Sequence, residues 1–176
     1  MDSISECDTF RFMMKESIER IAVRARYDPF RMGIPFIWCS NNLVSAFITQ
    51  CWLYERLTGD CSYRIYEATA RDWLFGCNPW GTSMITGLPQ GGDFPDDIHS
   101  ALSHKGKYRV DGGLVDGPVY SSIFNGLKGV FLSSPDEYAE VQPSFIVYHD
   151  DYADYSTNEP TMDGTASLAL YLAGIE

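Results

Sequence analysis

Residues 148–159 read YHDDYADYSTNE, and an apolar run from 164 to 173 follows them closely. Four carboxylic acids and three tyrosines therefore gather just before a predicted helix. A carboxyl group that acts as a general acid needs a raised pKa, and apolar rings and neighbouring carboxylates both raise one. Glu159, with Tyr155 four residues before it and Pro160 directly after it, is the candidate for that role.

The same stretch fits two other descriptions. It can be an acidic loop that simply faces water, or Asp150, Asp151 and Asp154 can offer hard oxygen ligands to calcium, although their spacing is not that of an EF-hand. Composition by itself leaves both alternatives open.

Elsewhere the sequence predicts helices joined by loops of unequal length. Apolar residues recur at three- and four-residue spacing over 4–25, and again up to Leu57 in a helix that Asn41 or Asn42 can cap. Further helices are expected over 63–75, from Pro118 through Leu127, and over 164–173. No alternating strand pattern and no internal repeat is present, so 1–176 is predicted to be a single all-α domain.

Two long connections, 77–117 and 133–163, carry most of the glycines, prolines and unusual side chains. Loops of this length are typically functional or disordered. Because the first contains Trp80, His99 and His104, the sequence favours function.

The composition narrows the class of partner. The 176 residues have a formal net charge of −11, which repels phosphate backbones and argues against nucleic acid. Aromatic residues make up 14% of the chain, and rings beside acidic groups suit sugars, although most rings in a protein belong to its core. Five cysteines without a C-x-x-C pair predict free thiols rather than a zinc site or a disulfide framework. We expect no cofactor and no metal, and neither a signal peptide nor a membrane-spanning segment is recognisable, which leaves the compartment unknown.

The 148–166 region resembles the second signature of glycoside hydrolase family 9. Its aromatic, Asp, aromatic and Glu positions are matched by Tyr148, Asp150, Tyr155 and Glu159, while Thr165 stands where the family has Asn. In that family the signature Glu protonates the leaving glycosidic oxygen, so the resemblance implies this role for Glu159. It also implies that Tyr155 lies beside the cleaved sugar.

A second segment, 74–87, resembles the Gly-x-Asn-Pro-x-Gly-x-Ser-x-x-Thr-Gly loop of the same family. His99 then matches the His of a His-x-Arg pair that contacts substrate, but Ala101 replaces the Arg. The predicted substrate contacts are therefore His99, Tyr155, Asp150 and Trp80. The missing Arg suggests a β-glycan other than plain cellulose, or short or amino-substituted oligosaccharides.

Two further segments, 35–42 and 111–118, resemble the family's Trp-Gly-Ser-Asn and Gly-Pro segments, so the likeness extends over roughly 30–176. It implies part of an (α/α)6 barrel, or toroid, with long functional loops, and inverting hydrolysis of β-glycosidic bonds, as in endoglucanases, cellodextrinases or exo-glucosaminidases. The Asp-Ala-Gly-Asp-like motif that carries the family's catalytic base does not occur here. We therefore expect this chain to be the C-terminal part of a domain whose N-terminal half is its partner, and to be inactive alone. The alternative is a helical domain that binds carbohydrate without cutting it.

Overall fold

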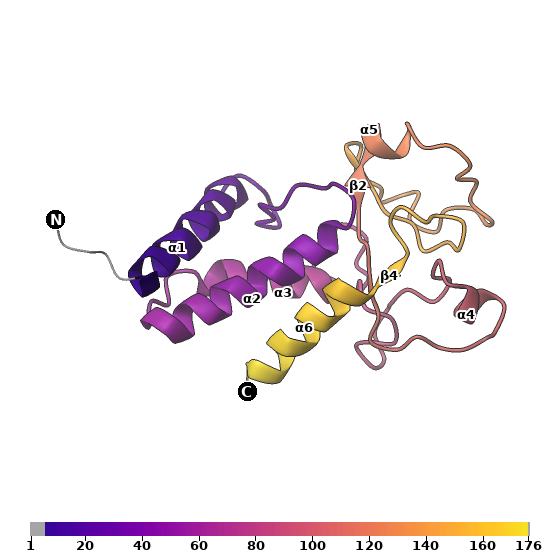
Figure 1. The fold of residues 1–176 in the computed structure, drawn as a ribbon. Helices are drawn as coiled ribbons and strands as arrows, with labels where there is room; N and C mark the ends of the chain where they lie inside the picture. The colour runs from indigo at the N-terminus through magenta and orange to yellow at the C-terminus, as the bar shows by residue number, and fades with distance from the viewer. Residues whose placement is uncertain (1–5, 176) are drawn as a thin grey trace.

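In this computed structural model, which describes residues 6–175, the long helices gather at one end and the long loops at the other (Figure 1). The helices of more than one turn are α1 (Glu6–Ala25), α2 (Ser40–Thr58), α3 (Arg64–Leu74) and α6 (Met162–Gly174). Two single turns, α4 (Ala101–His104) and α5 (Ser121–Phe124), lie in the loop end.

Helix α2 is the centre of the helical end, because α1, α3 and α6 all pack against it. Its buried stripe includes Val44, Phe47, Ile48 and Cys51, which recur every three or four residues. The helix ends at Gly59, whose φ of 74° is a left-handed conformation that glycine adopts at little cost. The apolar periodicity thus accounts for the buried face of α2, and the glycine accounts for its end.

Four two-residue strands organise the loop end. β1 (Leu114–Val115) pairs antiparallel with β4 (Pro160–Thr161), and β2 (Val119–Tyr120) pairs antiparallel with β3 (Ile146–Val147). The turn between β1 and β2 contains Gly117, at φ 87°, where a Cβ atom would lie 2.3 Å from the Asn41 side chain. Only glycine lets the start of α2 approach this turn so closely.

The start of α6 is tied to the same place. Thr165, which stands where the resemblance predicts Asn, accepts a hydrogen bond from the Leu114 backbone N–H at 3.0 Å and donates to the Thr161 carbonyl at 2.6 Å. The Asn42 amide donates to Asp163 at 2.9 Å. Helices α2 and α6 thus meet the β1–β4 ladder at one junction.

The helix-rich prediction is confirmed, with three local corrections. The helix expected from Pro118 to Leu127 is wrong: Val119 and Tyr120 form β2, and only the single turn α5 follows. Cys39, rather than Asn41 or Asn42, precedes α2, and it supplies no side-chain cap. The last helix begins at Met162 instead of Gly164, while the expected start at residue 4 lies outside the described residues. Residues 6–175 form no closed barrel, so the partial toroid stays a prediction.

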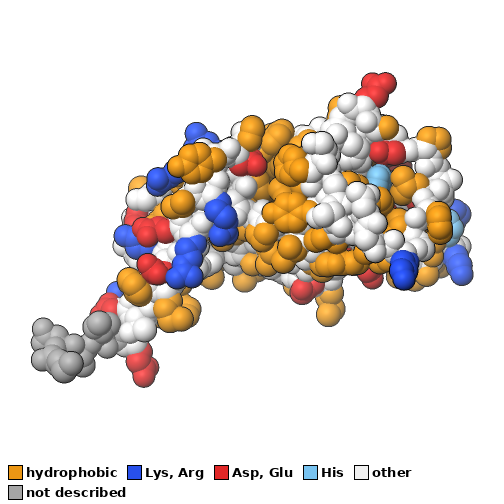
Figure 2. Space-filling model, turned by 90° about the horizontal axis from the view of Figure 1, so that it is seen from above, with side chains coloured by type: hydrophobic (Ala, Val, Ile, Leu, Met, Phe, Trp, Pro, Cys, Tyr) orange, Lys and Arg blue, Asp and Glu red, His pale blue; other side chains and the backbone are white. Residues whose placement is uncertain are grey.

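The helical end exposes large apolar side chains. In the view from above, hydrophobic groups also gather between the helical end and the loop end (Figure 2). The exposed side chains on the long helices include Phe10, Phe12 and Met13 of α1, Leu53 and Leu57 of α2, and Leu170 of α6.

Because exposed apolar surface on this scale usually marks an interface, we expect the isolated chain to associate with itself. Light scattering should give a mass that rises with protein concentration above the 19.8 kDa of one chain. A single species of 19.8 kDa at all concentrations would contradict this expectation. Phe12→Gln in α1 should weaken the association, whereas Lys107→Gln in the loop end should not.

Candidate active site

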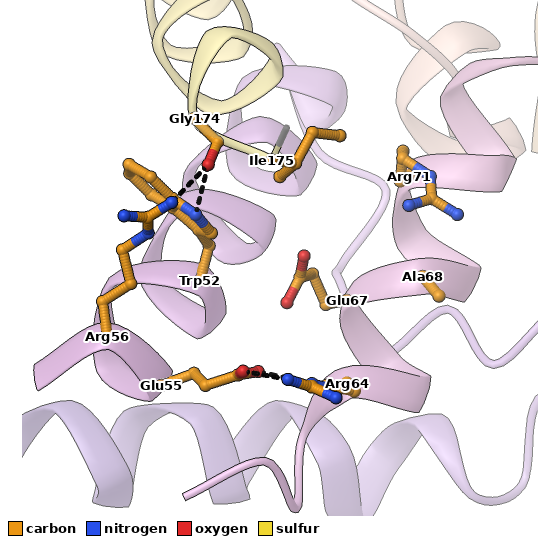
Figure 3. A pocket seen from close by; sticks show the side chains of 9 residues that line it. All are labelled: Trp52, Glu55, Arg56, Arg64, Glu67, Ala68, Arg71, Gly174 and Ile175. Carbon is orange, nitrogen blue, oxygen red and sulfur yellow. Dashed lines mark hydrogen bonds and ion pairs between the residues drawn. The ribbon is translucent and has the colours of Figure 1, made fainter. Parts of the chain in front are cut away.

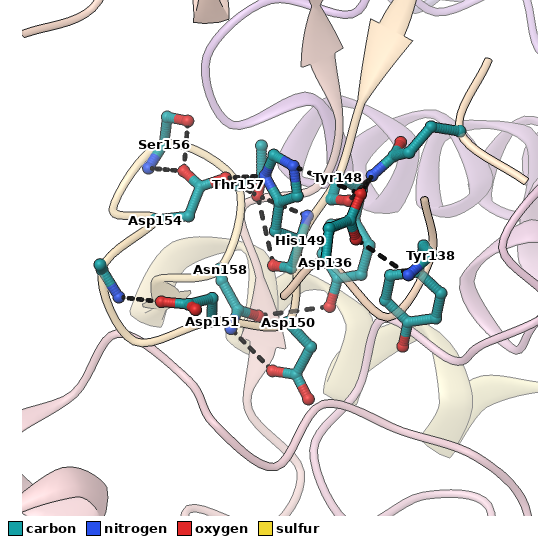
Figure 4. A network of polar contacts seen from close by, with 12 residues as sticks. Asp136, Tyr138, Tyr148, His149, Asp150, Asp151, Asp154, Ser156, Thr157 and Asn158 are labelled. Carbon is teal, nitrogen blue, oxygen red and sulfur yellow. Dashed lines mark hydrogen bonds and ion pairs between the residues drawn. The ribbon is translucent and has the colours of Figure 1, made fainter. Parts of the chain in front are cut away.

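The loop 148–159 is held by carboxylates that point inward (Figure 4). Asp154 is fully buried and accepts hydrogen bonds from His149 Nδ1 at 2.8 Å, from the Thr157 hydroxyl at 2.8 Å and from the Ser156 backbone N–H at 2.9 Å. The Ser156 hydroxyl donates a fourth, at 2.5 Å. One side chain thus fixes the bend that precedes Glu159.

Asp150 and Asp151 brace the loop against its two neighbours. Asp150 accepts from the backbone N–H groups of Asp96 at 2.7 Å and Asp97 at 3.2 Å, and from the Asn158 amide at 2.7 Å. Asp151 accepts from the Ser133 backbone N–H at 2.7 Å and from the Ser133 hydroxyl at 2.9 Å. The loop is therefore fastened to both 91–100 and 133–134.

These bonds rule out a loop whose aspartates simply face water. Asp97, Asp136, Glu137, Asp150 and Asp151 do line a pocket of about 210 Å³ together with His149. Within residues 6–175, however, no three His, Cys, Asp or Glu side chains are placed to hold one metal ion. The three aspartates act on the backbone instead, which leaves Glu159 as the acid of this stretch that faces solvent.

The pKa shifts of the braces follow from their surroundings. Burial raises the pKa of Asp150 to about 6, although the Asp96 N–H and the Asn158 amide act against the rise. The pKa of Asp154 is lowered: burial alone would raise it, but the hydrogen bonds from His149, Ser156 and Thr157 together outweigh burial. The loop therefore needs a charged Asp154, and it tolerates a neutral Asp150 below about pH 6.

Glu159 lies at the end of this braced loop, directly before β4. Its side chain is exposed, while its backbone carbonyl accepts a hydrogen bond from the Asp116 N–H at 2.9 Å. The preceding residue, Asn158, is buried and accepts on its carbonyl from the His99 N–H at 2.9 Å. The backbone of Glu159 is thus fixed on both sides and only its carboxyl group reaches solvent.

A row of rings includes Tyr152 and Tyr155 of the loop that ends at Glu159. Trp38, which is 44% exposed, stacks on Tyr155 with ring centres 6.0 Å apart. Tyr155 meets the edge of His99 at 6.2 Å, and His99 stacks on Tyr152 at 5.2 Å. His104 covers the other side of Tyr152 at 3.8 Å. A row of ring faces and edges of this kind can contact the CH faces of several sugar units.

The structure places the predicted contact residues unequally. His99 and Tyr155 lie in this row, and His99 Nδ1 lies 2.5 Å from the Tyr152 carbonyl oxygen, which fixes its ring. The carboxylate of Asp150 is instead occupied by the Asp96 backbone N–H and the Asn158 amide. Ala101, where the resemblance predicts Arg, begins the single turn α4, and this turn ends at His104.

Trp80 needs correction as a sugar contact. Its ring is only 6% exposed, it packs edge-on against Trp73 and Tyr148, and its N–H donates to Gln142 at 2.8 Å. Trp80 therefore belongs to the core beneath the loop. Its position in a long loop suggested exposure, but residues from other segments of the chain cover it.

A pocket of about 550 Å³ lies elsewhere, among α2, α3 and the end of α6 (Figure 3). Three arginines line it, and each already has a partner. Arg56 donates to the Gly174 carbonyl, Arg64 is paired with Glu55, and Arg71 is paired with Asp72. The hollow is therefore a feature of helix packing that shares no residue with the surroundings of Glu159.

Sequence reasoning missed three residues of this site. Trp38 was noted only within a segment of family likeness, Asp154 only as a possible calcium ligand, and Asp116 had no role. The spacing of Trp38 from Tyr155, and of Asp116 from Glu159, along the chain gives no sign that these residues meet. The fold brings them together through the start of α2 and the β1–β4 ladder.

Comparison with known proteins identifies the family of this chain and solved structures with a similar fold. The family model of glycosyl hydrolase family 9 matches residues 6–172. No match was found among curated proteins. The solved structure of the family 9 endoglucanase J30 is 21% identical and superposes with a TM-score of 0.73 over 98% of this chain. AaCel9A in complex with cellobiose-like isofagomine (22%, TM-score 0.68, 95%) and the Bacteroides ovatus GH9 protein (20%, TM-score 0.70, 97%) are also similar.

The match covers only part of each solved structure. This chain covers 31% of the J30 chain, 31% of the AaCel9A chain and 29% of the Bacteroides ovatus chain. It thus spans about a third of the length of the solved structures it resembles. Since the family model matches nearly the whole chain, this protein belongs to glycosyl hydrolase family 9.

Proposed function

We propose that this chain supplies the acid side of an inverting β-glycosidase, with Glu159 as the general acid. The observation that carries the proposal is the contrast within one loop. Asp150, Asp151 and Asp154 are occupied with bracing the backbone, whereas Glu159 presents its carboxyl group to solvent at the end of the loop whose Tyr155 stacks on Trp38. An acid held rigidly beside a sugar platform is what proton transfer to a glycosidic oxygen requires.

The reaction needs a second carboxylate. In an inverting glycosidase a base activates water from the opposite face of the sugar, at about 6.5–9.5 Å from the acid. We assign the base to the part of a family 9 domain that this chain does not span. The exposed apolar faces of α1, α2 and α6 then pack against that part, which would complete the toroid.

The substrate class follows from the row of rings. We propose a β-glucan or a related oligosaccharide, bound with its CH faces on Trp38 and Tyr155. The endoglucanases among the similar structures are consistent with this class. Because Ala101 cannot provide the charge of an arginine, the sugar at that point is held by the neighbouring His99.

Removing the platform tests this proposal in the chain as it stands. Trp38→Ala should weaken binding of cello- or chito-oligosaccharides roughly 3- to 10-fold, since a ring contact is worth about 0.5–1.5 kcal/mol. Isothermal titration calorimetry measures the effect. Tyr27→Ala is the control, because that ring is 87% exposed and lies in the connection between α1 and α2, outside the row.

The wild-type chain alone should bind these oligosaccharides without hydrolysing them. Absence of any binding would contradict the proposed cleft, and turnover by the chain alone would place the base within these residues. The alternative function, a module that binds carbohydrate without cutting it, predicts that binding persists but that the chain shows no hydrolysis even when the rest of a family 9 domain is supplied.

A further inference from the structure

Asp116 lies directly opposite Glu159 in an antiparallel ladder. Leu114 pairs with Thr161 and Val115 with Pro160, and the next bond in the same register runs from the Asp116 N–H to the Glu159 carbonyl at 2.9 Å. Side chains directly opposite each other in such a ladder share a face, with Cβ atoms about 4.5–5.5 Å apart. Two carboxyl groups therefore lie side by side, one buried and one exposed.

The Asp116 side chain is 3% exposed and incompletely paired. It hydrogen-bonds with the Cys39 thiol, whereas its Oδ1 atom is buried and has no hydrogen-bond partner within residues 6–175. A buried carboxylate with an unpaired oxygen is costly when it is charged and much less so when it is neutral. The site therefore favours a proton on Asp116.

The backbone of Cys39 gives independent evidence that the contact between Cys39 and Asp116 is a specific feature of this structure. It occupies a left-handed conformation, φ 57° and ψ 42°, which is strained for any residue but glycine. The segment it belongs to resembles one that has glycine at this point. This chain has a cysteine at that position in spite of the strain, and its thiol reaches Asp116.

Several negative groups from different elements act on Asp116. They are Glu159 before β4, Asp163 at the start of α6 and Asp154 in the braced loop, while Cys39 contacts it from the start of α2. Burial is the largest cause of its raised pKa, about 6, and the three carboxylates raise it further, whereas the Cys39 hydrogen bond lowers it. A charge on Glu159 and a charge on Asp116 thus oppose each other.

We propose that Asp116 is a positioning residue of Glu159, a buried partner that fixes its backbone and sets the charge that faces its carboxyl group across the ladder. The titration of Asp116 then depends on the charge of Glu159. The inference rests on the proposed function of Glu159 for its catalytic meaning. The coupling itself is a property of the chain that can be measured without activity.

Carbon-13 NMR of the side-chain carboxyl groups tests the coupling in this chain. Glu159→Gln removes the opposing charge, so the titration midpoint of Asp116 should fall by about half to one pH unit. Cys39→Gly relieves the backbone strain and removes the thiol hydrogen bond, so the midpoint should rise. Glu16→Gln in α1 is the control and should leave the midpoint in place. An unchanged midpoint in Glu159→Gln would overturn the proposal.

In the complete enzyme the readout is the pH dependence of kcat. Asp116→Asn keeps the shape of the side chain and removes a carboxyl group whose pKa burial raises to about 6, so the profile should lose the part of its pH dependence near pH 6 that Asp116 contributes. If Glu159→Gln abolishes hydrolysis while Asp116→Asn leaves the pH profile of kcat unchanged, the role proposed for Asp116 is wrong, whereas the role proposed for Glu159 is supported. If Glu159→Gln leaves hydrolysis intact, the proposed function itself fails, whatever NMR shows.

Discussion

Glu159→Gln is expected to lower hydrolysis of natural glycosides by about 10²–10⁴-fold in the complete family 9 domain. Glutamine keeps the size and the hydrogen-bonding shape of the side chain but carries no transferable proton. Because Glu159 is exposed and its backbone is fixed through Asp116, the substitution should leave the fold in place. The loss should therefore appear in kcat rather than in the unfolding temperature.

A comparison of two substrates isolates the missing proton. A phenolate leaves without protonation far more readily than a sugar alkoxide, so aryl glycosides should lose much less activity than cello-oligosaccharides. Glu140→Gln, an exposed acid in the 133–147 connection, serves as the matched control and should be close to wild type on both. Equal and mild losses of Glu159→Gln on both substrates would show that this side chain has only a structural role.

Asp154→Ala is expected to be the most damaging substitution among the bracing carboxylates. It leaves His149, Ser156 and Thr157 without the acceptor that they share in a fully buried site. Removing one partner from a buried charged pair typically costs about 3–5 kcal/mol. Urea denaturation should show that loss, and oligosaccharide binding should fall with it because Tyr155 follows directly. A stability within about 0.5 kcal/mol of wild type would show that Asp154 is not the brace.

The same residue predicts a pH dependence. The pKa of Asp154 is lower in the folded chain than in the unfolded chain, so its stabilising effect is fully present above the unfolded value of about 3.9. That effect is lost as pH falls further, through the folded pKa. Between pH 6 and pH 3 the wild-type chain should therefore lose more stability than Asp154→Asn, which has no such charge to protonate. Equal losses in the two proteins would contradict the assignment.

Local sequence signals predicted the long helices well. Helices α2 and α3 fall within two residues of their predicted bounds, because apolar periodicity marks their buried faces and a glycine follows closely after each. The helix expected after Pro118 failed for a non-local reason. Val119 and Tyr120 pair with Val147 and Ile146, about 27 residues away, and that pairing overrides the local preference.

The acidic loop 148–159 likewise shows some features that the local sequence predicted and others that only the fold decided. Its sequence made Glu159 the candidate acid and placed Tyr155 among the substrate contacts. It could not separate the acids that brace the loop from the acid that faces solvent, because composition is the same for both. Burial decided this: Asp151 and Asp154 turn toward backbone donors, and Trp80 is covered by Trp73 and Tyr148.

By itself, the sequence determined the helix-rich class and the family likeness and made Glu159 the candidate acid, since these depend on periodicity and on motifs within short segments. The tertiary structure alone brought Trp38 onto Tyr155 and Asp116 opposite Glu159. These partners are 117 and 43 residues apart in the chain, by subtraction of their numbers. Contacts at such distances arise only when α2, β1 and β4 pack at one junction, and no local preference of the chain encodes that packing.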